Sequence, residues 1–204
     1  AKQFFQDAVE RELISKNPFF GMKGTVGSNR ERDFFIDREL VQKVMDALPN
    51  TEWRLLFALM RFGGLRCPSE IVALTWDDVK WAEDKIRIPS PKTEHHEGKD
   101  FRVAPIFPEL RPYLEDAWKL AENGEKYVIT RYRNSNANLR TQFMRYMDRA
   151  GIKTWPKLFH NLRSSGSTEI RKAFPDHVAA AWFGHSVPIA NKHYWQVTDD
   201  DFAR

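Results

Sequence analysis

Four short segments of the chain each place a cationic or proton-transferring side chain beside a break in regular structure. They are Gly63-Gly64-Leu65-Arg66, Pro91-Lys92-Thr93, His160-Asn161-Leu162-Arg163 and Gly184-His185-Ser186. A tyrosine, Tyr194, follows nine residues after His185. Arginines, a lysine and histidines that converge in a core repel one another, so a bound anion is the natural neutraliser of such a cluster. A phosphodiester is an anion of this kind.

Helical patterns precede the first of these segments. Asp37 can cap a helix whose apolar residues recur at helical spacing, and Thr51 can cap a second helix, which Gly63-Gly64 ends. Pro68 suits the first turn of a third helix, so Arg66 is expected in the tight entry to it.

A strand pattern follows, and helices then return. Residues 85–88 and 101–103 alternate apolar with polar side chains, which predicts an antiparallel pair of strands joined by the polar segment that holds Lys92. Helices are predicted around 109–121, 137–150, 160–172, 176–183 and 189–197. We therefore expect a mostly helical domain with a small sheet, and Tyr194 in its last helix.

The order and spacing of these residues resemble the catalytic domain of the tyrosine recombinases, the phage integrase family. The family pattern has an arginine after a Gly-Leu pair, a lysine on a β-hairpin, a His-x-x-Arg box, a Gly-His pair and a tyrosine nine residues beyond that histidine. The matching residues, within a resemblance that runs from Arg30 to Thr198, are Arg66, Lys92, His160 with Arg163, His185 and Tyr194. The implied fold is mainly α with a small antiparallel β-sheet, an α+β fold.

The resemblance also divides the chain. Residues 1–29 are expected to be the end of a core-binding domain helix plus a linker, and residues 30–204 the catalytic domain. Asn17-Pro18-Phe19 matches the exit from the first of these domains. Because the chain begins with Ala1 inside a helical pattern, we expect an excised fragment.

Two assignments depart from the family pattern or have rivals. The family places an acidic residue three positions after the first arginine, whereas Glu70 lies four positions after Arg66. Residues three and four positions apart lie on the same face of a helix, so Glu70 is expected to support the site through a contact with Arg66. Lys92 matches the Pro-Lys-Thr position, but Lys85 and Lys99 lie in or beside the same hairpin.

The resemblance implies how the residues act. Tyr194 would attack a DNA phosphate and form a 3′-phosphotyrosine while a 5′-hydroxyl departs. His160 would be the base, Lys92 the general acid, and Arg66 and Arg163 the donors to the non-bridging oxygens, with His185 completing the donor set. No metal and no other cofactor is expected. Family members act as homotetramers on double-stranded DNA and exchange C-terminal segments.

The distribution of charge points to the same partner. Lys and Arg number 32 against 28 Asp and Glu, a formal net charge of +4. Residues 126–153 hold seven basic side chains against one acidic side chain, whereas residues 109–125 hold two against five. We expect the basic stretch to bind DNA, chiefly through Arg131, Arg133, Arg140 and Arg145.

Composition excludes several other classes of protein. The chain has 204 residues, of which 42% are hydrophobic and 29% charged, so it is long and apolar enough to fold around a core. The single cysteine, Cys67, excludes an internal disulfide framework. No apolar run reaches the length of a membrane span, so a cytoplasmic protein without membrane contact is expected.

Other interpretations of the same residues stay open. A type IB topoisomerase-like enzyme uses the same phosphotyrosine, and a DNA-binding relative can keep this fold without catalysis. A metal-dependent nuclease is disfavoured because carboxylates do not cluster near the histidines. A single buried histidine is more often a structural hydrogen-bonding group than a catalyst, and only the ordered set favours catalysis.

Overall fold

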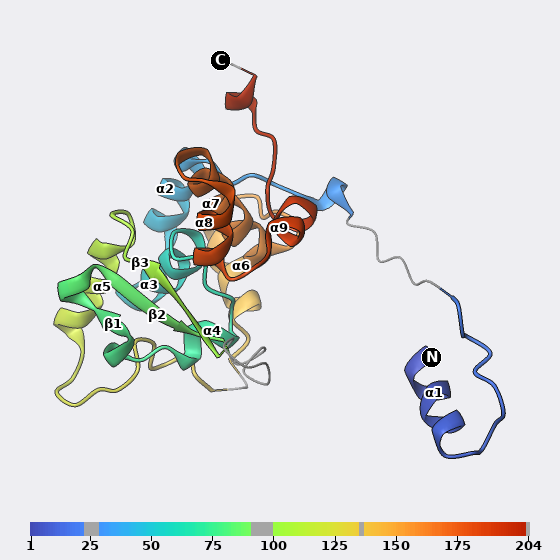
Figure 1. Cartoon of the computed structure of the whole chain (residues 1–204). Helices are drawn as coiled ribbons and strands as arrows, with labels where there is room; N and C mark the ends of the chain where they lie inside the picture. The colour runs from blue at the N-terminus through green and yellow to red at the C-terminus, as the bar shows by residue number, and fades with distance from the viewer. Residues whose placement is uncertain (23–28, 91–99, 135–136, 203–204) are drawn as a thin grey trace.

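The computed structural model describes residues 1–22, 29–90, 100–134 and 137–202 (Figure 1). Helices predominate and a three-stranded antiparallel sheet lies among them, which confirms the predicted fold class. None of the described helices is long and apolar enough to cross a membrane. The helices have these bounds: α1 Lys2–Glu10, α2 Arg38–Ala47, α3 Thr51–Arg61, α4 Ser69–Ala73, α5 Arg111–Leu120, α6 Leu139–Arg149, α7 Leu158–Ala173, α8 Asp176–Phe183 and α9 Val187–His193.

Helix α3 lies in the core of the domain. Its side chains from Leu55 to Arg61 are all buried, and it packs against α5 and α7. The Asn50 side chain accepts a hydrogen bond from the Trp53 backbone N–H at 2.9 Å, so Asn50 is the N-cap and the prediction that Thr51 caps this helix is wrong. Either residue type can cap a helix, and the actual start of the helix selects Asn50.

Helices α3 and α7 are joined by a buried ion pair. The fully buried Arg61 guanidinium donates to both carboxylate oxygens of Glu169, at 2.7 and 3.1 Å. A Cβ at Gly166 would lie 2.1 Å from the Arg61 carbonyl oxygen, so only glycine permits this approach of the two helices. The helix that carries the His-x-x-Arg box is therefore fixed against the core.

The sheet has the order β1-β2-β3, with β1 Val79–Lys80, β2 Lys85–Pro89 and β3 Phe101–Pro105. In β2 the isoleucines face inward, as the alternation predicts. In β3 the alternation is reversed: Arg102 is 8% exposed, whereas Phe101 and Val103 are 40% and 45% exposed. Arg102 pairs with Ile88 across the strands and shares its buried face. The buried Arg102 guanidinium is stabilised by hydrogen bonds to Trp182 and Glu70 on neighbouring elements.

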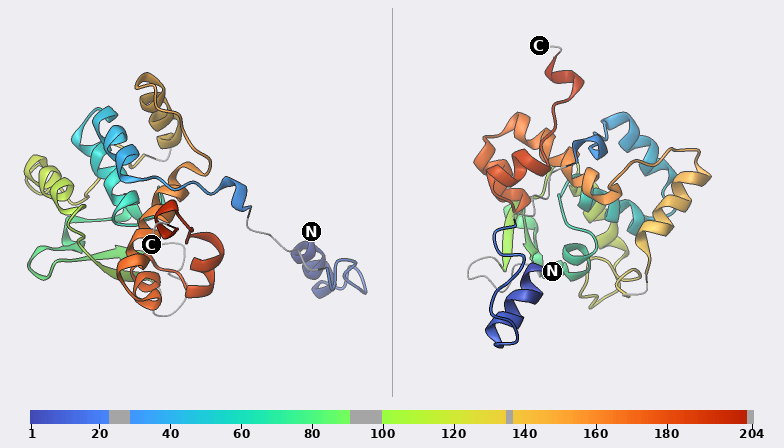
Figure 2. Two further views of the ribbon diagram at one scale, coloured as in Figure 1. Left: turned by 90° about the horizontal axis from the view of Figure 1, so that it is seen from above. Right: turned by 90° about the vertical axis from the view of Figure 1, so that its right-hand side faces the viewer.

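The C-terminal third wraps back onto the sheet and α3. Helix α8 packs on β3, and α7, α8 and α9 lie beside one another (Figure 2). Helix α9 ends at His193, earlier than predicted, so Tyr194 follows the last α-helix as its C-cap rather than lying within it. After Trp195 the chain remains bonded to α7, where Lys172 pairs with Asp201 at 3.1 Å.

The aromatic residues mostly fill the core. The buried tryptophans are Trp53, Trp76, Trp155 and Trp195. Trp118 is 51% exposed and packs edge-on against Trp76. Cys67 is partly buried, and burial raises the pKa of its thiol to about 12, which leaves it protonated and unreactive at neutral pH.

The start of α3 provides a direct test of the fold. Replacing Asn50 with alanine removes the cap bond to Trp53 and is expected to lower the free energy of unfolding by about 1 kcal/mol. Thr51→Ala is the matched control and is expected to change it by less than about 0.5 kcal/mol. Urea denaturation followed by circular dichroism measures both. A larger loss in Thr51→Ala than in Asn50→Ala would contradict the observed cap.

Candidate active site

Five of the predicted site residues converge on one place, between the end of α3, α7 and the segment after α8. The Tyr194 ring lies between two imidazoles, with its centroid 4.8 Å from that of His160 and 4.5 Å from that of His185. The Arg163 guanidinium carbon lies 5.3 Å from the centre of the Tyr194 ring. The Arg66 guanidinium donates a hydrogen bond of 2.9 Å to the carbonyl oxygen of Gly184, the residue before His185.

A single buried carboxylate, that of Glu70, ties the arginines together. Glu70 accepts from the Arg66 backbone N–H at 2.8 Å, and its carboxylate also pairs with the Arg66 guanidinium. The Arg163 guanidinium lies 3.8 Å from the same carboxylate. The extra residue between Arg66 and Glu70 therefore does not separate the two side chains, because both lie at the entry to the short helix α4.

The ionisation of Glu70 follows from these neighbours. Burial by itself raises the pKa of the carboxyl group. The hydrogen bonds and charge of Arg102, with the charges of Arg163 and Arg66, outweigh burial and lower this pKa to about 2. Glu70 is therefore a carboxylate at neutral pH.

Arg163 is almost completely buried, and its side chain is 3% exposed. Its two terminal nitrogens donate to the carbonyl oxygens of Gly64 and Phe183. Burial, together with the charges of Arg102 and Arg66, lowers the pKa of Arg163 to about 9, so it remains a cation at neutral pH. Its Nε has no hydrogen-bond partner among the described residues.

The two histidines are neutral at pH 7. Burial and the charges of Arg163, Arg66 and Arg102 lower the pKa of His185 to about 3. Burial also lowers the pKa of His160. The His160 Nε2 lies 3.0 Å from the His193 carbonyl oxygen, which can only accept a hydrogen bond. Nε2 of His160 therefore carries the proton, and Nδ1 is free to act as an acceptor.

The backbone around Tyr194 is held by buried hydroxyl groups on one face of α7. Ser164 Oγ donates to the Tyr194 carbonyl oxygen, and Thr168 Oγ1 accepts from the Gln196 backbone N–H at 3.1 Å. The Trp195 indole N–H donates to Ser167 Oγ at 3.0 Å. The protein's own helix α7 thus fixes the segment that carries the tyrosine.

Of the other predicted residues, Lys92 and its rival Lys99 lie outside the described residues. The other rival, Lys85, lies in β2 and pairs with Glu83 at 3.4 Å. The structure therefore describes no lysine from the hairpin connection.

The four predicted DNA-binding arginines have different surroundings. Arg140 and Arg145 are exposed along α6, and no ion pair involves them within the described part of the chain. Arg133 stacks on the Tyr127 ring at 3.1 Å and donates to the Val72 carbonyl oxygen. Arg131 lies at the edge of an acidic cavity.

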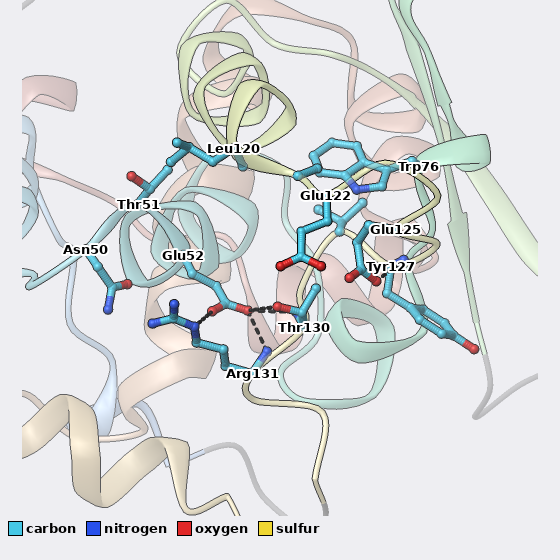
Figure 3. A pocket seen from close by; sticks show the side chains of 13 residues that line it. Asn50, Thr51, Glu52, Trp76, Leu120, Glu122, Glu125, Tyr127, Thr130 and Arg131 are labelled. Carbon is cyan, nitrogen blue, oxygen red and sulfur yellow. Dashed lines mark hydrogen bonds and ion pairs between the residues drawn. The ribbon is translucent and has the colours of Figure 1, made fainter.

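That cavity has a volume of about 290 Å³ and lies between the start of α3, the end of α5 and the chain that follows it (Figure 3). Glu52, Glu122 and Glu125 line it, and the Arg131 guanidinium is 3.9 Å from Glu52. Three carboxylates in one cavity repel a phosphate, so this cavity does not suit a DNA backbone. Within the described ranges, no three His, Cys, Asp or Glu side chains group in a way that holds a metal ion.

Sequence reasoning missed two parts of the site: Arg102 and the hydroxyl face of α7. Arg102 donates to both carboxylate oxygens of Glu70, at 2.8 and 2.9 Å. Its apolar neighbours in β3 favoured the opposite orientation, so the strand gave no signal for it. The run Ser164-Ser165-Gly166-Ser167-Thr168 is an unusual density of small hydroxyl residues in a helix and was a signal available in the sequence.

The lowered histidine pKa values make stability depend on pH. Between about pH 6.5 and 3 the unfolded chain protonates His185 and the folded chain does not, so acid favours unfolding in this window. When the pH falls from about 6.5 to 5, the free energy of unfolding is expected to decrease in both proteins, and the decrease is expected to be about 1 kcal/mol smaller in His185→Asn than in the unmodified chain. Urea denaturation at each pH measures this loss.

His177, on the exposed surface of α8, supplies the control. His177→Asn is expected to keep the pH dependence of the unmodified chain. If His185→Asn and His177→Asn lose equal stability on acidification, the buried neutral state of His185 is wrong.

Comparison with known proteins places this geometry among related sequences and folds. A sequence model described as the phage integrase family matches residues 35–200. No curated protein sequence matches the chain.

Solved structures share the fold. A crystal structure of XerA recombinase is 19% identical with a TM-score of 0.68, and the alignment covers 83% of this chain and 62% of that one. The Tn1549 transposon integrase in complex with transposon right end DNA is 16% identical with a TM-score of 0.73, and the alignment covers 99% of this chain and 74% of that one.

A lambda integrase tetramer bound to a Holliday junction is 19% identical with a TM-score of 0.68. The alignment covers 98% of this chain and 59% of the lambda chain. This chain therefore spans less than two thirds of the length of the XerA and lambda proteins.

Proposed function

The chain belongs to the phage integrase family, and on that premise we propose that it is a site-specific recombinase that cleaves and rejoins double-stranded DNA through a 3′-phosphotyrosine. The observation that carries this proposal is the position of Tyr194, whose ring lies between His160 and His185 and beside Arg163. A nucleophile, two neutral imidazoles and an excess of positive charge at one point suit transfer of a phosphodiester to the tyrosine oxygen.

The reaction exchanges one ester for another. The Tyr194 hydroxyl oxygen bonds to phosphorus, the bond from phosphorus to the 5′ sugar oxygen breaks, and the 5′-hydroxyl leaves with a proton. His160 accepts the tyrosine proton at Nδ1, since its Nε2–H is held by the His193 carbonyl. Lys92 supplies the proton to the departing oxygen.

Positive charge stabilises the transition state. Arg66, whose side chain is 29% exposed, faces the phosphate with the donors that Glu70 and Gly184 leave unused. Arg163 and neutral His185 complete the set of donors to the non-bridging oxygens. In this proposal the arginines, and no metal or other cofactor, balance the charge that develops on the phosphorus oxygens.

The proposed partners are double-stranded DNA and three further copies of the protein. The lambda integrase relative is a tetramer on a Holliday junction, and the Tn1549 relative is bound to transposon DNA. Phe202, which is 82% exposed in the C-terminal segment, supports an exchange of C-terminal segments between neighbours. We assign residues 1–29 to the end of a core-binding domain and its linker, and residues 30–204 to the catalytic domain.

A covalent adduct tests the chemistry. The chain is incubated in EDTA with a pool of nicked duplexes whose sequence is degenerate around the nick, and protein bound to DNA is detected on a denaturing gel. We expect an adduct from the unmodified chain and a loss of at least about 10³-fold in Tyr194→Phe, because the nucleophilic oxygen is gone.

Tyr127→Phe is the matched control, since Tyr127 lies at the acidic cavity, and it is expected to keep full adduct formation. Failure of the unmodified chain to form any adduct would favour a DNA-binding relative without catalysis. Strand hydrolysis that EDTA abolishes would favour a nuclease. Relaxation of supercoiled plasmid without strand exchange would favour the topoisomerase alternative.

Because side chains of α7 hydrogen-bond to the segment around Tyr194, we predict that the tyrosine of each protomer attacks the phosphate bound by the arginines of the same protomer. Mixing Tyr194→Phe with Arg66→Ala, each inactive alone, is therefore expected to leave adduct formation below about a tenth of the activity of the unmodified chain. Recovery to about a quarter of that activity or more would show that the tyrosine reaches a neighbour's phosphate and would contradict this prediction.

A further inference from the structure

Arg102 is the third arginine of the cluster, and no motif points to it. It lies on the buried face of β3, and its side chain is 7% exposed. Its guanidinium makes four hydrogen bonds: two to the Glu70 carboxylate at 2.8 and 2.9 Å, one to the Gly64 carbonyl oxygen at 3.1 Å and one from Nε to the Trp182 carbonyl oxygen at 2.9 Å. Four of its five N–H groups are therefore engaged within the protein.

These partners lie on the segments that deliver the reacting residues. Gly64 precedes Arg66 at the end of α3, Glu70 is in α4, and Trp182 is near the end of α8, just before His185. The Arg102 stem also fills the space beside Gly184, where a Cβ would lie 2.8 Å from Arg102 Cδ. Arg102 thus joins three elements at the point where each turns toward the site.

Arg102 changes how the Glu70 carboxylate is shared among the arginines. With Arg66 and Arg163 as its only partners, the Glu70 carboxylate would accept more of their N–H groups and leave fewer for a phosphate. Arg102 donates to both oxygens of Glu70, while Arg66 keeps a partly exposed side chain. We infer that Arg102 is a positioning residue for the reaction: it holds Glu70 and the Gly184-His185 turn so that Arg66 and Arg163 keep donors for the scissile phosphate. This inference rests on the proposed function.

Arg102 does not itself bind the phosphate in this arrangement, because four of its five N–H groups donate to protein acceptors. Arg163 donates with its two terminal nitrogens, and its Nε has no partner among the described residues. The two roles differ in salt dependence. Each arginine that binds a phosphate contributes about −0.9 to the slope of log affinity against log salt. Arg66→Gln is expected to reduce that slope by about 0.9, whereas Arg102→Gln is expected to leave it unchanged.

The experiment compares Arg102→Gln with the unmodified chain on the nicked duplex pool. We expect DNA affinity within about twofold and a single-turnover rate of adduct formation lower by about 10²-fold, the cost of misplacing a reacting group by about 1 Å. Arg111→Gln is the matched control, since Arg111 also forms ion pairs, with Asp84 and Glu115, but lies on α5. Its rate is expected to stay within about twofold.

A second measurement does not depend on activity. Arg102 is the strongest of the neighbours that lower the pKa of Glu70, so carbon-13 NMR is expected to show the Glu70 carboxyl titrating at a higher pH in Arg102→Gln than in the unmodified chain. If the unmodified chain forms no adduct, the proposed function fails. If Glu70 then titrates at the same pH in Arg102→Gln as in the unmodified chain, the inference about Arg102 is overturned as well. If Glu70 titrates at a higher pH in Arg102→Gln, the result supports the contact of Arg102 with Glu70.

The following outcomes decide the inference when the unmodified chain is active. A folded Arg102→Gln with the rate of the unmodified chain overturns it. A salt slope reduced by about 0.9 also overturns it, because Arg102 would then bind phosphate directly. If circular dichroism shows that Arg102→Gln does not fold, Arg102→Lys replaces it, because lysine keeps the positive charge and loses the forked N–H donors of the guanidinium group. A rate of adduct formation about tenfold lower in Arg102→Lys supports the inference. An unchanged rate overturns it.

Discussion

One buried carboxylate, that of Glu70, is the interaction on which the site depends. Arg66, Arg102 and Arg163 all lie within ion-pair distance of it, and its side chain is 1% exposed. Three guanidinium groups without it would repel one another in a low-dielectric interior. With it, the cluster keeps an excess of positive charge, and that excess is what makes the site suited to an anion such as a DNA phosphate.

Burial and the same positive charge together keep the two histidines neutral. Burial lowers the pKa of His185, and the charges of Arg163, Arg66 and Arg102 lower it further, to about 3. His160 is lowered in the same direction, by burial first. Both imidazoles are therefore neutral where the proposed reaction needs an acceptor and a hydrogen-bond donor, and the arginines supply the positive charge of the described cluster.

Hydroxyl groups position the tyrosine segment at little electrostatic cost. Ser164, Ser167 and Thr168 are each at most 2% exposed and use their oxygens on the backbone or indole of residues 194–196. Charged side chains in those places would change the balance around Glu70. Neutral hydroxyls hold the chain through directional hydrogen bonds and leave the electrostatics of the site to the arginines.

The sequence by itself determined the periodic elements and the order of the matching residues, because helical spacing, strand alternation and Gly or Pro breaks act over a few neighbours. Only the tertiary structure decided that Arg102 faces inward, since its partner Glu70 lies 32 positions away and outweighs the local alternation. It also decided that Tyr194 follows α9, where its backbone is held by Ser164, 30 positions away. These features depend on contacts between distant segments, which local patterns do not encode.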